Sequence, residues 1–153
     1  AVIGDPVNCE RMLDNEEAVI AFPEGVRGSN KLYKHKYQLQ RFGSGFMHLA
    51  MKHDAPIIPV GIVGMEETIR SYANIKPLAK AFGMPVAPLV LPFIFPSKVF
   101  IHFGKPLYFE NDVYKEHDIT ERVNIVKEAI NELIQEGLAK REAYKAEQQT
   151  KKK

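Results

Sequence analysis

The residues with the clearest chemical use stand together in one run, Phe22 to Gly28, which reads F-P-E-G-V-R-G. Glycines let a backbone come close to a ligand, and the N–H groups of a turn can bind an anion. An arginine binds phosphate through two parallel hydrogen bonds. The run therefore predicts an anion-binding loop that carries one carboxylate, Glu24. On the residues alone, a glycine turn with a surface ion pair is an open alternative.

The charge pattern around this run agrees with an anion-binding role. The chain has a net charge of only +2, from 21 Lys and Arg against 19 Asp and Glu. No Asp or Glu occurs between Gly25 and His53, where the cations are Arg27, Lys31, Lys34, Lys36, Arg41 and Lys52. Such an acid-free segment should create positive potential and attract phosphates or anionic lipid, although a solvated basic loop remains the alternative.

The elements that must position this loop form an alternating series. Short apolar runs bounded by polar residues or proline predict buried strands, and apolar residues at i, i+3, i+4 spacing predict helices. Strands that alternate with helices indicate the α/β class, with a mixed sheet flanked by helices. Pro59 indicates an edge position or a bulge in its strand. The sequence predicts helices over 5–13, 44–52, 65–72, 76–82 and 120–145, strands over 18–22, 57–63 and 99–103, and a polar loop over 23–37.

Length and composition restrict the class of protein. A chain of 153 residues supports one domain with a core, and 45% hydrophobic with 26% charged residues excludes a collagen or a disordered chain. The single cysteine, Cys9, cannot form an intrachain disulfide, so we expect a reducing compartment. Three or four strands are few for such a sheet, and the chain begins with Ala1 rather than Met. We therefore expect a partial domain over residues 1–138, with further sequence before Ala1.

Two other segments bear on membranes. Residues 81–97 carry no formal charge but contain four prolines, which would break the hydrogen-bond ladder of a spanning helix. They predict either a core-packing loop or a surface that dips into the membrane interface through Phe93, Ile94 and Phe95. Residues 139–153 have a local charge of +4 and predict a basic tail, helical or disordered, that extends into solvent.

Several stretches resemble the glycerophospholipid acyltransferase family. The run Phe22–Arg27 resembles its third motif, F-P-E-G-T/V-R, and Pro56–Val60 resembles its fourth, which lies on a strand. Residues 43–50 resemble the helix that follows the third motif, and Phe103–Leu107 is similar to a late F-G-x-P segment. The order and separations agree over about residues 1–110.

The resemblance implies a fold, a reaction and a set of binding residues. The fold would be a membrane-associated mixed α/β domain at the cytoplasmic face. The reaction would transfer a fatty acyl group from acyl-CoA or acyl-carrier protein to a hydroxyl of a lysophospholipid or glycerol phosphate, without a cofactor. Glu24 and Gly25 would shape the acceptor site, Arg27 would bind its phosphate, and the 56–60 segment would form the acyl-donor side. The expected substrate-binding residues are Phe22, Pro23, Glu24, Gly25, Arg27, Lys31, Lys36, Pro56, Ile57, Ile58 and Pro59.

One family feature is missing. The family's catalytic signature, His-x-x-x-x-Asp, precedes the F-P-E-G motif, and its histidine deprotonates the acceptor hydroxyl. None of the five histidines lies before Phe22, and none is followed by Asp five positions later. A general base contributes roughly 10²–10⁴-fold, so we expect this chain alone to be inactive and to contain no catalytic residue. The missing half of the domain could precede Ala1 or belong to another chain, or the protein could be a natural short relative without chemistry.

The sequence is also compatible with two other functions. A non-catalytic module could bind anionic membrane or phospholipid through residues 27–41, the 81–97 stretch and the basic tail. Tyr33 and Tyr37 alternate with Lys34 and Lys36, as in a base-stacking surface, but no nucleic-acid motif accompanies them. We therefore expect no nucleic-acid partner. The histidines have no Cys or carboxylate at metal-ligand spacing, so no metal site is expected either.

Overall fold

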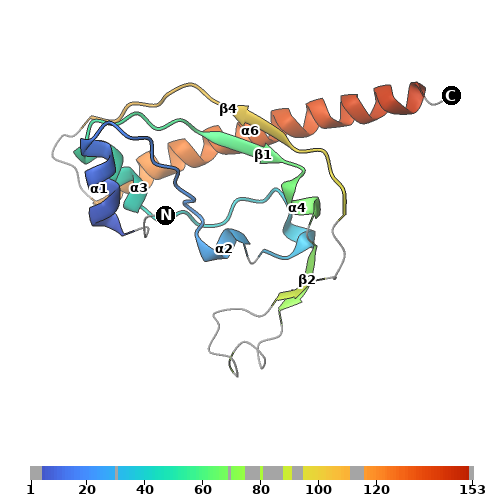
Figure 1. Ribbon diagram of the computed structural model, residues 1–153, viewed down its shortest axis with the longest axis horizontal. Helices are drawn as coiled ribbons and strands as arrows, with labels where there is room; N and C mark the ends of the chain where they lie inside the picture. The colour runs from blue at the N-terminus through green and yellow to red at the C-terminus, as the bar shows by residue number, and fades with distance from the viewer. Residues whose placement is uncertain are drawn as a thin grey trace.

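One long helix organises the molecule. The computed structural model describes residues 5–29, 31–68, 70–74, 80, 88–90, 95–110 and 116–151. Helix α6 (Glu116–Thr150) runs along one face of a two-stranded antiparallel sheet, made of β1 (Val60–Val63) and β4 (Phe100–Phe103) (Figure 1). Helices α1 (Pro6–Asp14) and α3 (Gly45–Lys52) lie together near the start of α6, whereas its C-terminal turns extend beyond the sheet.

The sheet and α6 approach closely because glycines stand at the contact. Val60 pairs with Phe103 and Val63 with Phe100, and a bridge between Ile57 and Leu107 continues the pairing. A Cβ on Gly61 would lie 2.7 Å from the Cβ of Leu133 in α6. The glycine therefore allows the strand backbone to lie against the helix backbone.

Apolar side chains of α3 and α6 form the larger part of the core. Apolar residues recur along one face of each helix, so both helices can bury that face against the other. A smaller cluster joins the sheet to α6 through Tyr37, Val63 and Ile134. The buried members of the larger cluster are Phe42, Met47, Met51, Ile119, Val123 and Val126.

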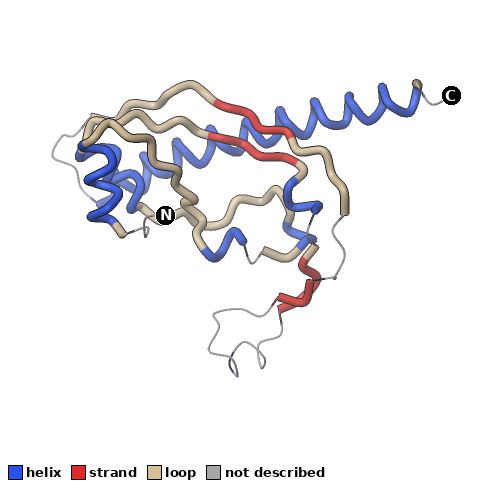
Figure 2. Tube along the Cα trace, viewed as in Figure 1, coloured by secondary structure: helices blue, strands red, loops and turns tan. Residues whose placement is uncertain are grey.

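The remaining elements are short. They are α2 (Val26–Ser29), the 3-10 turn η1 (Tyr33–His35), α4 (Met65–Thr68), and the antiparallel pair β2 (Ser71–Asn74) and β3 (Pro88–Val90). Figure 2 shows that this second pair projects away from the β1–β4 sheet.

Several sequence-based predictions are confirmed. Asp5 caps α1, since its Oδ1 accepts a hydrogen bond from the Val7 N–H (2.9 Å), and Pro6 is the first helical residue. Helix α3 and strand β4 each begin one residue later than predicted, and strand β1 begins three residues later. Helix α6 begins earlier and ends later than predicted, and it includes most of the basic tail as regular helix.

Other predictions are wrong. Residues 18–22 are extended but form no strand, and Ile20 and Phe22 are 83% and 77% exposed. A strand needs a partner for its backbone hydrogen bonds, and within the described part of the chain none lies beside this run. The helix predicted over 65–72 ends at Thr68, because residues 71–74 pair with β3 instead. The described sheets are two-stranded and antiparallel, so the predicted α/β architecture is confirmed only in part: helices accompany a small sheet that packs against α6.

The helix predicted over 76–82, apart from Lys80, and much of the 81–97 stretch, including Phe93 and Ile94, lie outside the described residues. Within the second stretch, Pro88–Val90 forms β3, and Phe95 packs against the side chain of Arg70. Among the described helices, none combines the length and the hydropathy that a membrane crossing requires.

The β1–β4 sheet has one covered and one open face. Gly61, Val63 and His102 face α6. Ile62, Ile101 and Phe103 point away from the helix and are exposed, although all three are large and apolar. Such a face commonly packs against further protein or lipid.

Candidate functional site

The F-P-E-G-V-R run forms a tight turn that leads directly into α2. The Gly25 N–H donates to the Phe22 carbonyl (2.9 Å), and Gly25 has a φ of +57°. An L-residue with a side chain pays roughly 1–2 kcal/mol in this left-handed region, so the turn explains the glycine. The Gly28 N–H then donates to the Gly25 carbonyl (3.1 Å) at the first turn of α2.

Glu24 fastens the turn to the following segment. Its Oε1 accepts a hydrogen bond from the Gln40 N–H, and the Pro23 carbonyl accepts one from the Gly43 N–H (2.9 Å). A Cβ on Gly28 would overlap the Glu24 side chain, lying 2.8 Å from its Cβ. The second glycine of the motif thus leaves room for the carboxylate. Glu24 acts here as an anchor of the loop.

Arg27 and Phe22 are exposed, as are Gly25 and Val26 of the same loop. The Arg27 guanidinium lies on α2, and among the described residues no carboxylate forms an ion pair with it. An arginine on a fixed turn that no described carboxylate neutralises can bind an anionic ligand. Its position agrees with the predicted phosphate role, which stays a prediction.

The two lysines predicted beside Arg27 are engaged within the protein. The Lys31 side chain is only 5% exposed, and its Nζ lies 2.7 Å from Glu66 Oε1. The Lys36 Nζ donates to the Tyr33 hydroxyl (3.3 Å) and lies 4.7 Å from the centre of that ring. Since Lys52 also pairs with a carboxylate, Glu10 (2.8 Å), the acid-free segment is less positive than its sequence suggests.

Tyr37 joins this segment to the sheet and to α6. Its N–H donates to Glu66 Oε2 (2.6 Å), and its hydroxyl donates to Glu67 Oε1 (2.8 Å). The same hydroxyl accepts from the Gly64 N–H (3.0 Å) and from Arg141 Nη1 (3.3 Å). Burial, together with the hydrogen bond to Glu67, raises the pKa of Tyr37 to about 12. The Tyr37 hydroxyl is therefore neutral at physiological pH, and its hydrogen bonds hold the ring in place.

Glu67 and Arg141 form the strongest charge pair of this network. Arg141 binds both carboxylate oxygens of Glu67, with Nη2 2.5 Å from Oε2, and also donates to Ser97 Oγ (3.1 Å). The hydrogen bonds from Arg141 lower the pKa of Glu67 to about 2, against the opposing effect of burial. Glu67 is therefore ionised at neutral pH.

This pKa predicts acid sensitivity. The folded pKa of Glu67 lies below the usual value of 4.5, so its contribution to stability is full above pH 4.5 and is lost as the pH falls towards 2. A depression of this size corresponds to about 3 kcal/mol. We expect the urea midpoint of unfolding to fall as the pH is lowered over that range, and we expect Glu67→Gln to reduce this dependence on pH. If the midpoint of Glu67→Gln depends on pH as the wild type does, groups other than Glu67 cause the acid sensitivity.

The predicted donor-side residues directly precede β1. Pro59 is buried, and its carbonyl accepts from the Gly104 N–H (2.9 Å). Ile57 is half-buried and bridges to Leu107, whereas Pro56 and Ile58 are exposed. This segment is thus held by the residues that follow β4, and the F-P-E-G-V-R loop is held separately by residues 40–43.

The histidines form no metal centre in the described part of the chain, where no group of three potential ligands occurs. His53 Nδ1 lies 2.9 Å from Asp14 Oδ1 and links α3 to α1. His102 faces Gly137 of α6, close to the helix. Neither histidine lies in the F-P-E-G-V-R loop.

Sequence reasoning missed Glu66, Glu67 and Arg141 as residues that support the site. One signal was present: two adjacent glutamates follow a long segment without acids, so they are natural counter-ions for its lysines. No comparable signal marks Arg141, which lies 74 residues after Glu67.

Comparison with known proteins agrees with the family resemblance of the F-P-E-G-V-R loop. The acyltransferase family model matches residues 6–63, a segment that includes the F-P-E-G-V-R loop and Pro56–Val60. This segment is therefore similar to the acyltransferase family, a family of transferases. The match indicates similarity to a family and shows neither the substrate nor whether the chain is catalytic.

The similar curated proteins are mycobacterial. Uncharacterized proteins of Mycobacterium bovis and Mycobacterium tuberculosis are 34% identical over 148 residues, which is 88% of this chain and 41% of theirs. An uncharacterized protein of Mycobacterium leprae is 38% identical over 111 residues, 66% of this chain and 30% of its own. The chain thus spans about two fifths of the length of the first of these relatives. No solved structure matches it significantly.

Proposed function

We propose that the protein serves the transfer of a fatty acyl group from acyl-CoA or acyl-carrier protein to a hydroxyl of a lysophospholipid or glycerol phosphate. The observation that carries this proposal is the exposed Arg27 on a fixed glycine turn, within the segment that matches the acyltransferase family. A phosphate on the acceptor would bind the guanidinium, and the turn would hold the adjoining hydroxyl in one place.

The other loop residues would position rather than react. Glu24 ties the turn to Gln40, so the orientation of Arg27 depends on it. Exposed Phe22 would contact the apolar part of the acceptor, and Ile58 the acyl chain of the donor. Lys31 would act indirectly, because its ammonium holds the loop to Glu66.

The general base would come from polypeptide outside these 153 residues. A histidine there would take the proton of the acceptor hydroxyl, whose oxygen attacks the thioester carbonyl, and the leaving thiolate would depart as the protonated thiol. Two observations support a further partner segment: the apolar face formed by Ile62, Ile101 and Phe103 is uncovered, and the curated relatives are longer. We propose that a segment outside these 153 residues packs on that face.

The acceptor implies a membrane surface, at the cytoplasmic face in our proposal. Ile20 and Phe22 are exposed apolar residues that precede Arg27 in the chain, a combination suited to contact with anionic lipid. The same observation favours the second candidate function, a phospholipid-binding module without chemistry.

The test is acyl transfer by the full-length protein. Palmitoyl-CoA is mixed with lysophosphatidic acid or with monoacylglycerol, and the released thiol is measured. We expect thiol release with the phosphorylated acceptor and much less with the neutral one. Binding to anionic vesicles without thiol release from any acceptor would support the binding module instead.

A further inference from the structure

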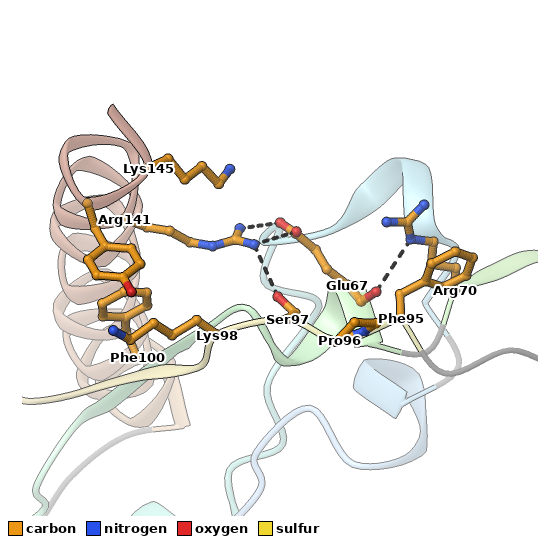
Figure 3. A pocket seen from close by; sticks show the side chains of 10 residues that line it. Glu67, Arg70, Phe95, Pro96, Ser97, Lys98, Phe100, Arg141 and Lys145 are labelled. Atoms are coloured by element: carbon orange, nitrogen blue, oxygen red, sulfur yellow. Dashed lines mark hydrogen bonds and ion pairs between the residues drawn. The ribbon is translucent and has the colours of Figure 1, made fainter. Parts of the chain in front are cut away.

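A second concentration of cations lies away from the F-P-E-G-V-R loop. It surrounds a pocket of about 240 Å³ between α4, the segment before β4 and the C-terminal half of α6. Figure 3 shows Arg141 and Lys145 reaching into this space from α6, with Arg70 facing them from the opposite side. The lining residues are Glu67, Arg70, Phe95, Pro96, Ser97, Lys98, Phe100, Arg141, Tyr144 and Lys145.

The charges of the pocket do not cancel. Its one carboxylate, Glu67, is neutralised by Arg141, which leaves Arg70, Lys98 and Lys145 in excess. Lys145 pairs with Glu142 (2.8 Å) in a solvent-exposed ion pair, and such pairs are weak enough to exchange for a ligand. Among the described residues, no carboxylate forms an ion pair with Arg70 or Lys98.

Aromatic rings hold two of these cations in place. The Arg70 guanidinium lies 4.0 Å from the centre of the Phe95 ring, and its Nε donates to the Glu67 carbonyl (3.4 Å). The Lys98 ammonium lies 3.7 Å from the centre of the Tyr144 ring. A cation held against a ring loses little side-chain entropy when a ligand binds.

One neutral donor completes the set. Ser97 Oγ accepts a hydrogen bond from Arg141 Nη2 (3.1 Å), so the hydroxyl proton remains for a ligand. Arginines and a lysine that approach from opposite sides suit a tetrahedral, doubly charged group better than a single planar carboxylate. The volume also exceeds what a bare phosphate occupies, and Phe95 and Tyr144 offer apolar walls to an organic substituent.

We propose that this pocket binds the phosphate monoester group of an organic ligand. Arg70 and Lys145 contact the phosphate from either side, Ser97 donates to it, and Arg141 contributes charge while it holds Glu67. The phosphate could come from a soluble nucleotide or from a lipid headgroup, and the experiment separates these sources. The proposal does not depend on acyl transfer, because binding is measured without a donor.

The test uses the full-length protein carrying Arg27→Ala, so that the F-P-E-G-V-R loop does not contribute. Adenosine 3′,5′-bisphosphate is titrated by calorimetry, and vesicles of phosphatidylcholine with and without phosphatidic acid are used in sedimentation. We expect one of the two probes to bind. Arg70→Gln combined with Lys145→Gln should weaken that binding by about tenfold or more, since hydrogen bonds to charged groups are lost.

The matched control combines Lys140→Gln with Lys151→Gln. These lysines lie on the same helix, are exposed, and each pairs with a glutamate one turn earlier. The control removes the same charge and should leave the dissociation constant within about twofold, because these lysines do not line the pocket and exposed charges are screened by salt. Arg70→Lys tests the geometry and should retain part of the binding. Equal loss in both double variants, or no binding of either probe, would overturn the proposal.

Discussion

Replacing Arg141 by methionine should lower the free energy of unfolding by about 3 kcal/mol, because it strands a largely buried carboxylate. The Arg141 and Glu67 side chains are only 8% and 16% exposed. Methionine fills a similar volume but donates no hydrogen bond, so among the described residues Glu67 keeps only the Tyr37 hydroxyl as a partner on Oε1. Urea unfolding followed by circular dichroism measures the change.

A double-mutant cycle makes this prediction specific. Adding Glu67→Gln to Arg141→Met removes the unpaired charge and should recover part of the lost stability. Lys140→Met is the control, since it removes a neighbouring cation whose pair with Glu136 is exposed, and it should leave the unfolding midpoint unchanged. If the losses of the two single variants simply add, the pair does not couple as described.

Replacing Gly61 by alanine should lower the free energy of unfolding by about 2 kcal/mol through overpacking. The new Cβ would lie 2.7 Å from Leu133 Cβ and 3.1 Å from the backbone nitrogen of Ile134. Because part of the obstacle is helix backbone, no change of side-chain rotamer relieves the overlap. Strand β1 would have to move away from α6, and the core around Val63 would loosen. Thermal unfolding measures the effect.

Gly45→Ala is the matched control for this glycine. Gly45 is the first residue of α3, and a Cβ there meets no atom within 4 Å. Alanine has the higher helix propensity, so this variant should be as stable as the wild type or slightly more stable. Equal destabilisation by both substitutions would mean that the effect is not one of packing between β1 and α6.

Local signals in the sequence predicted a large part of this fold. The start of α1 depends on a hydrogen bond between the Asp5 side chain and a backbone N–H two positions later. The apolar stripe of α6 depends on residues about one helical turn apart. The glycines of the F-P-E-G-V-R loop likewise have local causes, a positive φ at Gly25 and the Glu24 side chain at Gly28. Such features are visible because the residues that cause them are close in the chain.

Features that depend on distant partners were not predictable. Residues 18–22 have the composition of a strand, but a strand forms only where another backbone lies alongside. The ammonium of Lys31 is committed to Glu66, 35 positions later, so its charge could not be assigned to a ligand or to the protein from sequence. Arg141 belongs to a stretch that reads as a solvated tail, yet it is buried against Glu67 and Tyr37.

The central claim is that Arg27 on its fixed turn binds the phosphate of the acceptor. The most direct measurement is the steady-state kinetics of the full-length protein with lysophosphatidic acid and with monoacylglycerol, for the wild type, Arg27→Ala and Lys34→Ala. Lys34 is an exposed cation of the same segment and serves as the control. We predict that Arg27→Ala lowers kcat/KM for the phosphorylated acceptor by about tenfold or more and leaves the neutral acceptor unchanged. Equal kinetics for Arg27→Ala and Lys34→Ala with lysophosphatidic acid would contradict the claim.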